Sequence, residues 1–359
     1  MSYTNFNHKS WGAQLLALAA LTVPPVSLAQ IQLGDNIQLS GFGTISAAKT
    51  DNETPILFSR DITDEWCFDC DTTLGFQLNW QITTKLRTAV QVIKRPQDEF
   101  SSSELERAYI EYAFDSVRVQ AGRLRVPLYI MSEYYYVSSA YPWLRLPSTV
   151  YNNNLGITHY EGISADWSFL VNDQIQVSIN PYIAIPDKDD FELYGDNFTL
   201  DTVYAFGLSA EVYIEETLLH LAFSEIKTEQ EGLVSGDDTY ELTFVSLGLS
   251  HYLTDALHLQ AETLLESELY ANWYVSLDYH LGQLTPYIQY GQARKNLAFE
   301  SYLVGFRYDL TPQINTSVEW QRFSGRKNII SGEFTEPQNP QQPFASKVDL
   351  ISIGISFTF

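Results

Sequence analysis

Charged and aromatic side chains gather in one stretch near the middle of the chain. The residues of interest there are Arg123, Arg125, Glu133, Tyr135 and Arg145. Guanidinium groups provide fixed positive charge and bind a carboxylate or phosphate through paired hydrogen bonds. Tyrosine rings can wedge a loop against a wall and also face a solute. The stretch therefore predicts a surface that selects small charged molecules; the alternative is a contact loop whose tyrosines are structural.

The two cysteines stand in a C-x-x-C motif, as Cys67 and Cys70. In an exported protein, two cysteines this close together are expected to form a disulfide. A redox role for such a motif requires a thioredoxin-like βαβ context, which the surrounding sequence lacks. We expect a structural disulfide, with metal binding or redox chemistry as the alternatives.

Motifs of enzymatic chemistry are missing from the rest of the sequence. The histidines do not form an H-E-x-x-H pattern, and no serine stands in a G-x-S-x-G elbow. The formal net charge of −23 argues against a nucleic-acid partner, because the phosphate backbone attracts basic surfaces. We therefore expect no catalytic residues, no metal and no cofactor.

The last strand of the chain reads ISIGISFTF. Phe359, Phe357, Ile355 and Ile353 fall on one face, and small or polar residues fall on the other, since strand side chains alternate. A strand with an apolar face and a small polar face suits a transmembrane barrel with lipid outside and water inside. The alternative is an edge strand of a soluble sheet.

The first 29 residues resemble a secretory signal. A weakly basic start precedes an apolar stretch, and Ser27-Leu28-Ala29 forms a small-x-small cleavage site. No later run of 18 apolar residues follows. A chain that is exported to a membrane without such a run can cross it only as a closed barrel. We predict a signal peptide at 1–29 and one barrel domain at 30–359.

Segments of about ten residues with alternating polarity fill the remaining chain. They predict an all-β fold, an antiparallel barrel of about sixteen strands. Tight turns, such as Asp115-Ser116, alternate with long polar connections, such as Gly325–Lys347. Short periplasmic turns and long external loops follow this pattern in outer-membrane barrels. The 23 tyrosines and 7 tryptophans suit the membrane interface.

In these features the chain resembles Gram-negative outer-membrane porins. The resemblance implies sixteen strands, a homotrimer in the outer membrane, and a third external loop that folds inward and narrows the channel. That loop corresponds to 125–151, after the fifth strand. It also implies that Phe357 and Phe359 form the signal read by the barrel-assembly machinery. The Pro-Glu-Phe-Gly-Gly tip of general porins is missing, so their constriction residues cannot be transferred.

Strand alternation places three more arginines on the polar face, Arg87, Arg107 and Arg118. Because they fall on adjacent strands, they predict a positive ladder facing the loop. No matching cluster of acidic residues is evident, so we expect small anions to be favoured at the narrowing. The alternative is ordinary wetting of the lumen, which any polar residue provides.

The predicted function is passive diffusion of small hydrophilic solutes or ions, selected by pore width and fixed charge. The expected partners are outer-membrane lipid, the assembly machinery, identical subunits and the solutes. The main alternative is a narrow or plugged barrel with a surface-binding or structural role. A barrel hydrolase is the third.

Overall fold

The computed structural model describes residues 30–57, 60–96, 102–151, 158–193, 196–231, 238–267, 271–295, 298–325, 333–335, 338 and 345–359. The predicted signal peptide, 1–29, lies outside the described residues. Within the described part, no helix is both long and apolar enough to cross a membrane.

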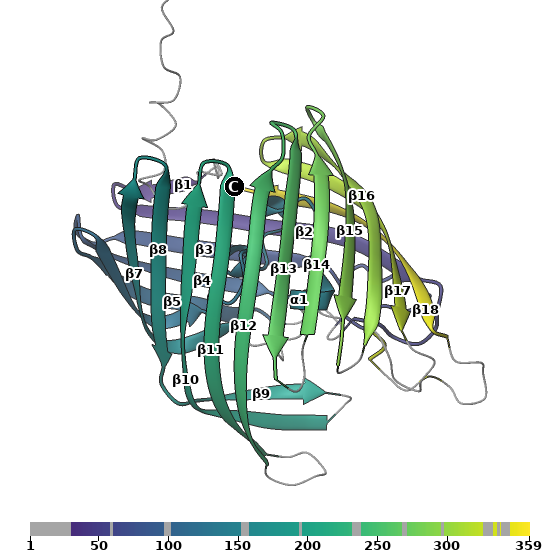
Figure 1. The fold of residues 1–359 in the computed structure, drawn as a ribbon, viewed down its shortest axis with the longest axis horizontal. Helices are drawn as coiled ribbons and strands as arrows, with labels where there is room; N and C mark the ends of the chain where they lie inside the picture. Colours follow the sequence, from purple (N-terminus) through teal and green to yellow (C-terminus); the bar gives the residue numbers. More distant parts are fainter. Residues whose placement is uncertain are drawn as a thin grey trace, which may run out of the picture.

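Sixteen antiparallel strands form a closed barrel, in agreement with the predicted fold class (Figure 1). Each strand pairs with the next, and the last strand pairs with the first to close the ring. The barrel strands are β2 (Ile37–Thr50), β3 (Thr73–Gln81), β4 (Leu86–Lys94), β5 (Glu104–Ala113), β6 (Val117–Arg125), β7 (His159–Asn172), β8 (Ile175–Ala184), β10 (Asp196–Ile214), β11 (Thr217–Glu231), β12 (Asp238–Tyr252), β13 (Leu257–Glu266), β14 (Ala271–Tyr279), β15 (Leu284–Ala293), β16 (Phe299–Thr311), β17 (Ile314–Gly325) and β18 (Lys347–Thr358).

Two short strands lie outside the ring and were not predicted. β1 (Ile31–Gly34) pairs with the beginning of β2, and β9 (Asp187–Leu193) pairs with the beginning of β10. In Figure 1, β9 and β10 extend beyond the barrel on the side of the long connections. The sequence 187–201 reads as a polar loop because hydrophobic alternation is weak there.

Burial along each strand is inverted relative to a soluble protein. On β18, Ile353 is 44 % exposed while the neighbouring Ser352 is fully buried. Outward aromatic rings gather near both ends of the strands. Those near the short turns include Trp80, Tyr112, Trp167, Tyr279 and Tyr308, and those near the long connections include Trp273, Tyr290, Tyr302 and Trp320. An apolar exterior between aromatic girdles is the surface that a lipid bilayer requires.

The two ends of the barrel differ in their connections, as predicted. Connections of two to four residues join β3 to β4, β5 to β6 and so on round the ring, at what we call the turn end. Longer connections lie mainly at the loop end. Figure 1 shows the short turns and the C-terminus together at the upper edge.

The long connection between β2 and β3, loop 51–72, folds back over the inner wall. Ala48 and Cys67 exchange two backbone hydrogen bonds of 2.9 Å, and Cys67 and Cys70 are joined in a disulfide. Ile56 and Ile62 are fully buried against residues of β2, β17 and β18. Loop 51–72 therefore covers part of the loop end rather than extending into solvent.

Two glycines shape the outer face of the closing seam between β18 and β2. The Phe359 ring lies over Gly41 and the Phe357 ring over Gly43, and a Cβ atom at either glycine would lie 2.3 or 2.6 Å from the ring. Phe359 also exchanges two backbone hydrogen bonds of 2.8 Å with Gly41. The missing glycine side chains thus allow the terminal aromatic rings to pack along the seam.

Gly41→Val should weaken the seam, because its side chain would occupy the position of the Phe359 ring. Overpacking of this kind costs about 1–3 kcal/mol. We expect a lower midpoint of thermal unfolding, measured by circular dichroism of the folded barrel in detergent. Ala47→Val, on the same outer face of β2, is the matched control. Equal midpoints for the two variants would contradict this account of the seam.

Candidate functional site: the inward loop and the barrel lumen

The connection between β6 and β7, which we call the inward loop (126–158), runs inside the barrel. It contains two short 3-10 turns, η1 (Ser132–Tyr134) and η2 (Ser138–Ala140), and one helical turn, α1 (Ser148–Tyr151). In Figure 1, α1 lies behind β12–β14. Residues 152–157 lie outside the described part of the chain. Prolines and adjacent bulky aromatics interrupt any strand pattern here, so the segment forms short turns.

Hydrogen bonds attach the inward loop to the far side of the barrel from β6. The backbone N–H of Ile130 and the hydroxyl of Tyr151 both donate to Glu262 on β13, each at 3.0 Å. The indole N–H of Trp143 donates to Ser276 on β14 at 2.9 Å. The loop therefore crosses the lumen and does not simply line the wall beside its own strands.

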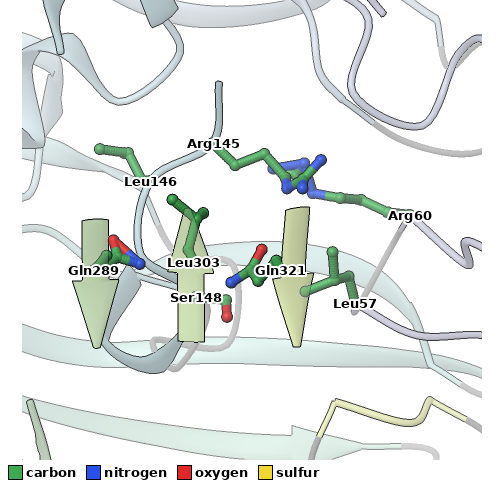
Figure 2. Close-up of a pocket in the computed structure, with 8 residues that line it drawn as sticks. All are labelled: Leu57, Arg60, Arg145, Leu146, Ser148, Gln289, Leu303 and Gln321. Atoms are coloured by element: carbon green, nitrogen blue, oxygen red, sulfur yellow. The ribbon is translucent and has the colours of Figure 1, made fainter. Parts of the chain in front are cut away.

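A buried ion network holds the middle of the inward loop. Arg145 contacts Asp71 and Glu319 and donates to Ser352 at 2.8 Å, while Arg60 donates to the other oxygen of Asp71 at 2.6 Å. Figure 2 shows Arg60 and Arg145 converging. Burial opposes the charge on Arg145, but Asp71 and Glu319 outweigh that effect and raise its pKa. Asp71 thus joins loop 51–72 to the inward loop.

A small cavity lies beside this network. Its lining includes the two arginines together with Ser148, Gln289 and Gln321, as Figure 2 shows. The space is sufficient for about one water molecule, which needs two to four polar partners. The cavity is therefore part of the packing beneath the loop and is too small for a solute.

The near wall holds the first part of the inward loop through a bulge in β5. Gln91 on β4 pairs with Arg107, but Val92 pairs with Leu105, so Glu106 is an extra residue. Glu106 is fully buried and binds Arg125 at 3.0 Å. The Arg125 guanidinium also lies 4.9 Å from the centre of the Tyr136 ring. Strict alternation would have placed Glu106 toward lipid; a carboxylate at such a position was the sequence signal for a bulge.

The predicted arginine ladder is present, but each of its members is paired. Arg87 lies 2.7 Å from Glu111, Arg107 lies 2.6 Å from Glu133, and Arg118 lies 3.1 Å from Asp166. The expectation that no acidic cluster faces the arginines is therefore wrong. Inward arginines are stabilised by nearby counter-charges, which the neighbouring strands supply for Arg87 and Arg118 and the inward loop supplies for Arg107. The ladder is a set of ion pairs rather than a positive strip.

Other predicted site residues lie elsewhere. Arg123 stands opposite Ala108 on β5 and opposite Glu161 on β7. Glu161 lies on the same face of β7 as Ile163, which is exposed on the outside of the barrel. Arg123 therefore lies on the barrel exterior and not in the lumen. Its guanidinium contacts the Glu161 carboxylate. The Tyr135 hydroxyl donates to the backbone of Tyr151 at 2.7 Å, inside the fold of the loop. Arg125, Tyr135 and Arg145 thus fix the loop and do not line an open passage.

Solvent exposure divides the lumen into two parts. At the turn end, several inward side chains remain accessible, and we call this space the vestibule; its walls include Arg87, Arg118, Asp166, Ser168, Ser178 and Glu211. Glu133, at the tip of the loop, is 55 % exposed there. At the loop end, inward side chains are buried on strands all round the ring, among them Ala48, Ile93, Glu106, Leu124, Ala184, Ile226, Leu264, Ser301 and Leu350. The two folded loops fill that half of the described barrel.

Comparison with solved structures places this architecture among bacterial outer-membrane channels. OmpF of Salmonella typhi, solved as a complex with daunomycin, aligns with a TM-score of 0.63 and 14 % sequence identity, over 92 % of this chain and 100 % of its own. The anion-selective porin from Comamonas acidovorans aligns with a TM-score of 0.61 and 10 % sequence identity, over 90 % of this chain and 99 % of the porin. The outer-membrane channel DcaP of Acinetobacter baumannii aligns with a TM-score of 0.57 and 11 % sequence identity, over 92 % of this chain and 100 % of DcaP.

The chain therefore has the fold of a porin-like outer-membrane barrel. No protein-family model and no curated protein sequence matches it. At these sequence identities the likeness establishes the architecture alone. What passes through the lumen must be argued from the side chains of this chain.

Arg145→Met should release the centre of the inward loop, because it leaves Asp71 and Glu319 buried with less compensation. Breaking a buried pair of this kind costs roughly 3–5 kcal/mol. We expect faster protease cleavage within residues 126–151 of the folded barrel, followed by mass spectrometry. Arg322→Met removes an exposed pair with Asp349 on the outer face, worth about 0–1 kcal/mol, and serves as control. Unchanged cleavage in Arg145→Met would rule out the anchoring role.

Proposed function

We propose that the protein is a porin-like channel of the outer membrane that passes small hydrophilic solutes or ions without a reaction or a cofactor. The observation that carries this proposal is the closed barrel with an apolar exterior, a polar interior and a loop folded across the lumen. Selection would rest on the width left beside the loop and on the fixed charges along that path.

The vestibule suggests where solutes would enter. Its accessible charged groups lie on β4, β6, β7 and β10 and at the loop tip, and a further ion pair, Arg307 with Asp309, lies on β16. We place the path along the first of these walls, where it passes Glu133. The charges along this wall nearly cancel: with the buried Arg107 and Glu111 included, three arginines, Arg87, Arg107 and Arg118, face the four carboxylates of Glu111, Glu133, Asp166 and Glu211. This balance supports weak cation preference in place of the anion preference expected from the sequence.

A second candidate function is a narrow or plugged barrel with a binding or structural role. The specific observation in its favour is the burial of inward side chains at the loop end, beneath loop 51–72 and the inward loop. A barrel in this arrangement conducts only if the two loops move or if a narrow passage remains between them. The two candidates share one fold and differ in measurable conductance.

Conductance in a planar bilayer separates these candidates. For the channel, we expect discrete current steps from the wild type, and larger steps when residues 131–147 are replaced by a short glycine-serine linker. Shortening the β9–β10 extension at 187–200 is the control and should leave the steps unchanged. A silent wild type together with a conducting linker variant would establish the plugged barrel. Silence of both, with folding verified by circular dichroism, would contradict the channel.

Charge substitutions in the vestibule test the path. Arg87→Gln with Arg118→Gln should move the reversal potential in asymmetric salt toward cations, because two positive charges leave the passage. Glu133→Gln should move it toward anions. Arg123→Gln is the control, since Arg123 lies on the outer face. If Arg123→Gln shifts the potential as much as the vestibule variants do, the proposed path is wrong.

Location and assembly are part of the same proposal. The exposed apolar band and its aromatic girdles support insertion in outer-membrane lipid, with the turn end toward the periplasm. We propose that Phe357 and Phe359 are recognised by the barrel-assembly machinery and that identical subunits form a trimer. The disulfide between Cys67 and Cys70 fits the oxidising environment outside the cytoplasm.

A further inference from the structure

A chain of hydrogen bonds links three adjacent strands at the turn end of the lumen. The Ser250 Oγ on β12 lies 2.8 Å from the Nε2 of His258 on β13. The Nδ1 of His258 lies 2.9 Å from an Oδ1 of Asp278 on β14. Asp278 is buried and His258 nearly so. A serine, a histidine and an aspartate are thus connected in the order that activates a nucleophile.

The sheet register fixes this arrangement. His258 stands directly opposite Asp278 on one side and opposite Tyr252 on the other. Ser250 is two residues before Tyr252 on the same inward face, at a diagonal position that reaches His258. The three side chains are therefore brought together by the pairing of β12, β13 and β14 and do not depend on a flexible loop.

The direction of these hydrogen bonds follows from the last acceptor in the series, the Asp278 carboxylate. A carboxylate only accepts hydrogen bonds, so the Nδ1 that faces Asp278 carries the proton. In that neutral tautomer Nε2 has a free lone pair and accepts the Ser250 hydroxyl proton. The second oxygen of Asp278 faces the Nε2 of His280 at 3.2 Å, which fixes the carboxylate from the other side. This is the division of roles in a Ser-His-Asp triad.

The group is accessible from the turn end. Ser250 is half-buried, and the β12–β13 and β14–β15 turns follow Tyr252 and Tyr279 directly. The Tyr252 ring packs 4.6 Å from the His258 ring, and the His280 side chain is 45 % exposed. Ser250 therefore keeps a partly exposed side chain close to this mouth of the barrel.

We infer that Ser250, His258 and Asp278 form an acyl-transfer site for small esters at the turn-end mouth. Ser250 Oγ attacks the ester carbonyl and passes its proton to His258 Nε2. The protonated His258 then gives that proton to the departing alkoxide, which leaves as an alcohol. Water, deprotonated by the same nitrogen, hydrolyses the acyl-serine to a carboxylic acid and restores the site. This inference is independent of whether the barrel conducts.

The oxyanion side of the site sets its expected rate. The backbone groups around Ser250 are engaged in the pairings with β11 and β13, so a strand position offers no pair of free N–H donors. Loss of one such donor lowers turnover by about 10²–10³ in known hydrolases. Tyr252, on the same face, offers a hydroxyl in their place. We therefore expect slow turnover, in which only reactive esters acylate Ser250 at a measurable rate.

Labelling with a fluorophosphonate tests the proposal directly on the folded wild-type protein. The modified peptides are quantified by mass spectrometry after a fixed exposure. Ser178 provides an internal control, because it is also inward and half-buried but is hydrogen-bonded to Ser168. We expect Ser250 to react at least about 100-fold faster than Ser178, which is the lower limit of the rate increase that a positioned general base typically provides.

Variants and a second readout complete the test. Ser250→Ala should remove the label, His258→Gln and Asp278→Asn should slow it by about 10²–10⁴, and each variant should retain the circular dichroism of a barrel. The rate of nitrophenolate release from 4-nitrophenyl acetate should be reduced in His258→Gln and Asp278→Asn and reduced most in Ser250→Ala. If wild-type Ser250 reacts no faster than Ser178, the hydrogen-bond chain is only structural and the proposal fails, whatever the variants do.

Discussion

The need to satisfy every backbone polar group within lipid governs the whole structure. An open sheet would leave a row of unpaired N–H and C=O groups at each edge, and only closure removes both edges. Closure depends on the pairing of residues 350–358 of β18 with residues 42–50 of β2. The glycine positions beneath Phe357 and Phe359 allow that meeting while the outer face stays apolar. The end of the chain therefore completes the fold.

Closure also creates an interior in which charge must be compensated. The inward arginines find carboxylates on the adjacent strand or on the inward loop, and Glu262 and Glu319 accept hydrogen bonds from loop backbone N–H groups. The same carboxylates that keep the wall polar therefore hold the loop across the lumen. Loop position and lumen electrostatics have one structural basis.

The fold could be predicted because a transmembrane barrel repeats one rule, with a period of two residues and a turn after each strand. The prediction of about sixteen strands agrees with the sixteen strands of the ring. The side-chain assignments failed for two different reasons. The bulge at Glu106 breaks the period and moves a residue to the inner face. Arg123 follows the unbroken alternation of β6, which places it on the outer face and not in the lumen. The ion pairs that Arg87 and Arg118 each form with a carboxylate depend on cross-strand register, and the burial of Arg145 depends on the position of loop 51–72. The period of two residues specifies neither the register nor the loop position.

The Asp71 carboxylate couples the two loops that fill the lumen, loop 51–72 and the inward loop, because it contacts both Arg60 and Arg145. If loop 51–72 withdrew alone, Arg145 would lose its nearest counter-ion in a dry environment; if the inward loop withdrew alone, Arg60 and Asp71 would lose their cover. Neither partial departure is favourable, so any movement of one segment would require movement of the other. An obstruction built in this way would open in one cooperative step, which would require rupture of a buried ion network.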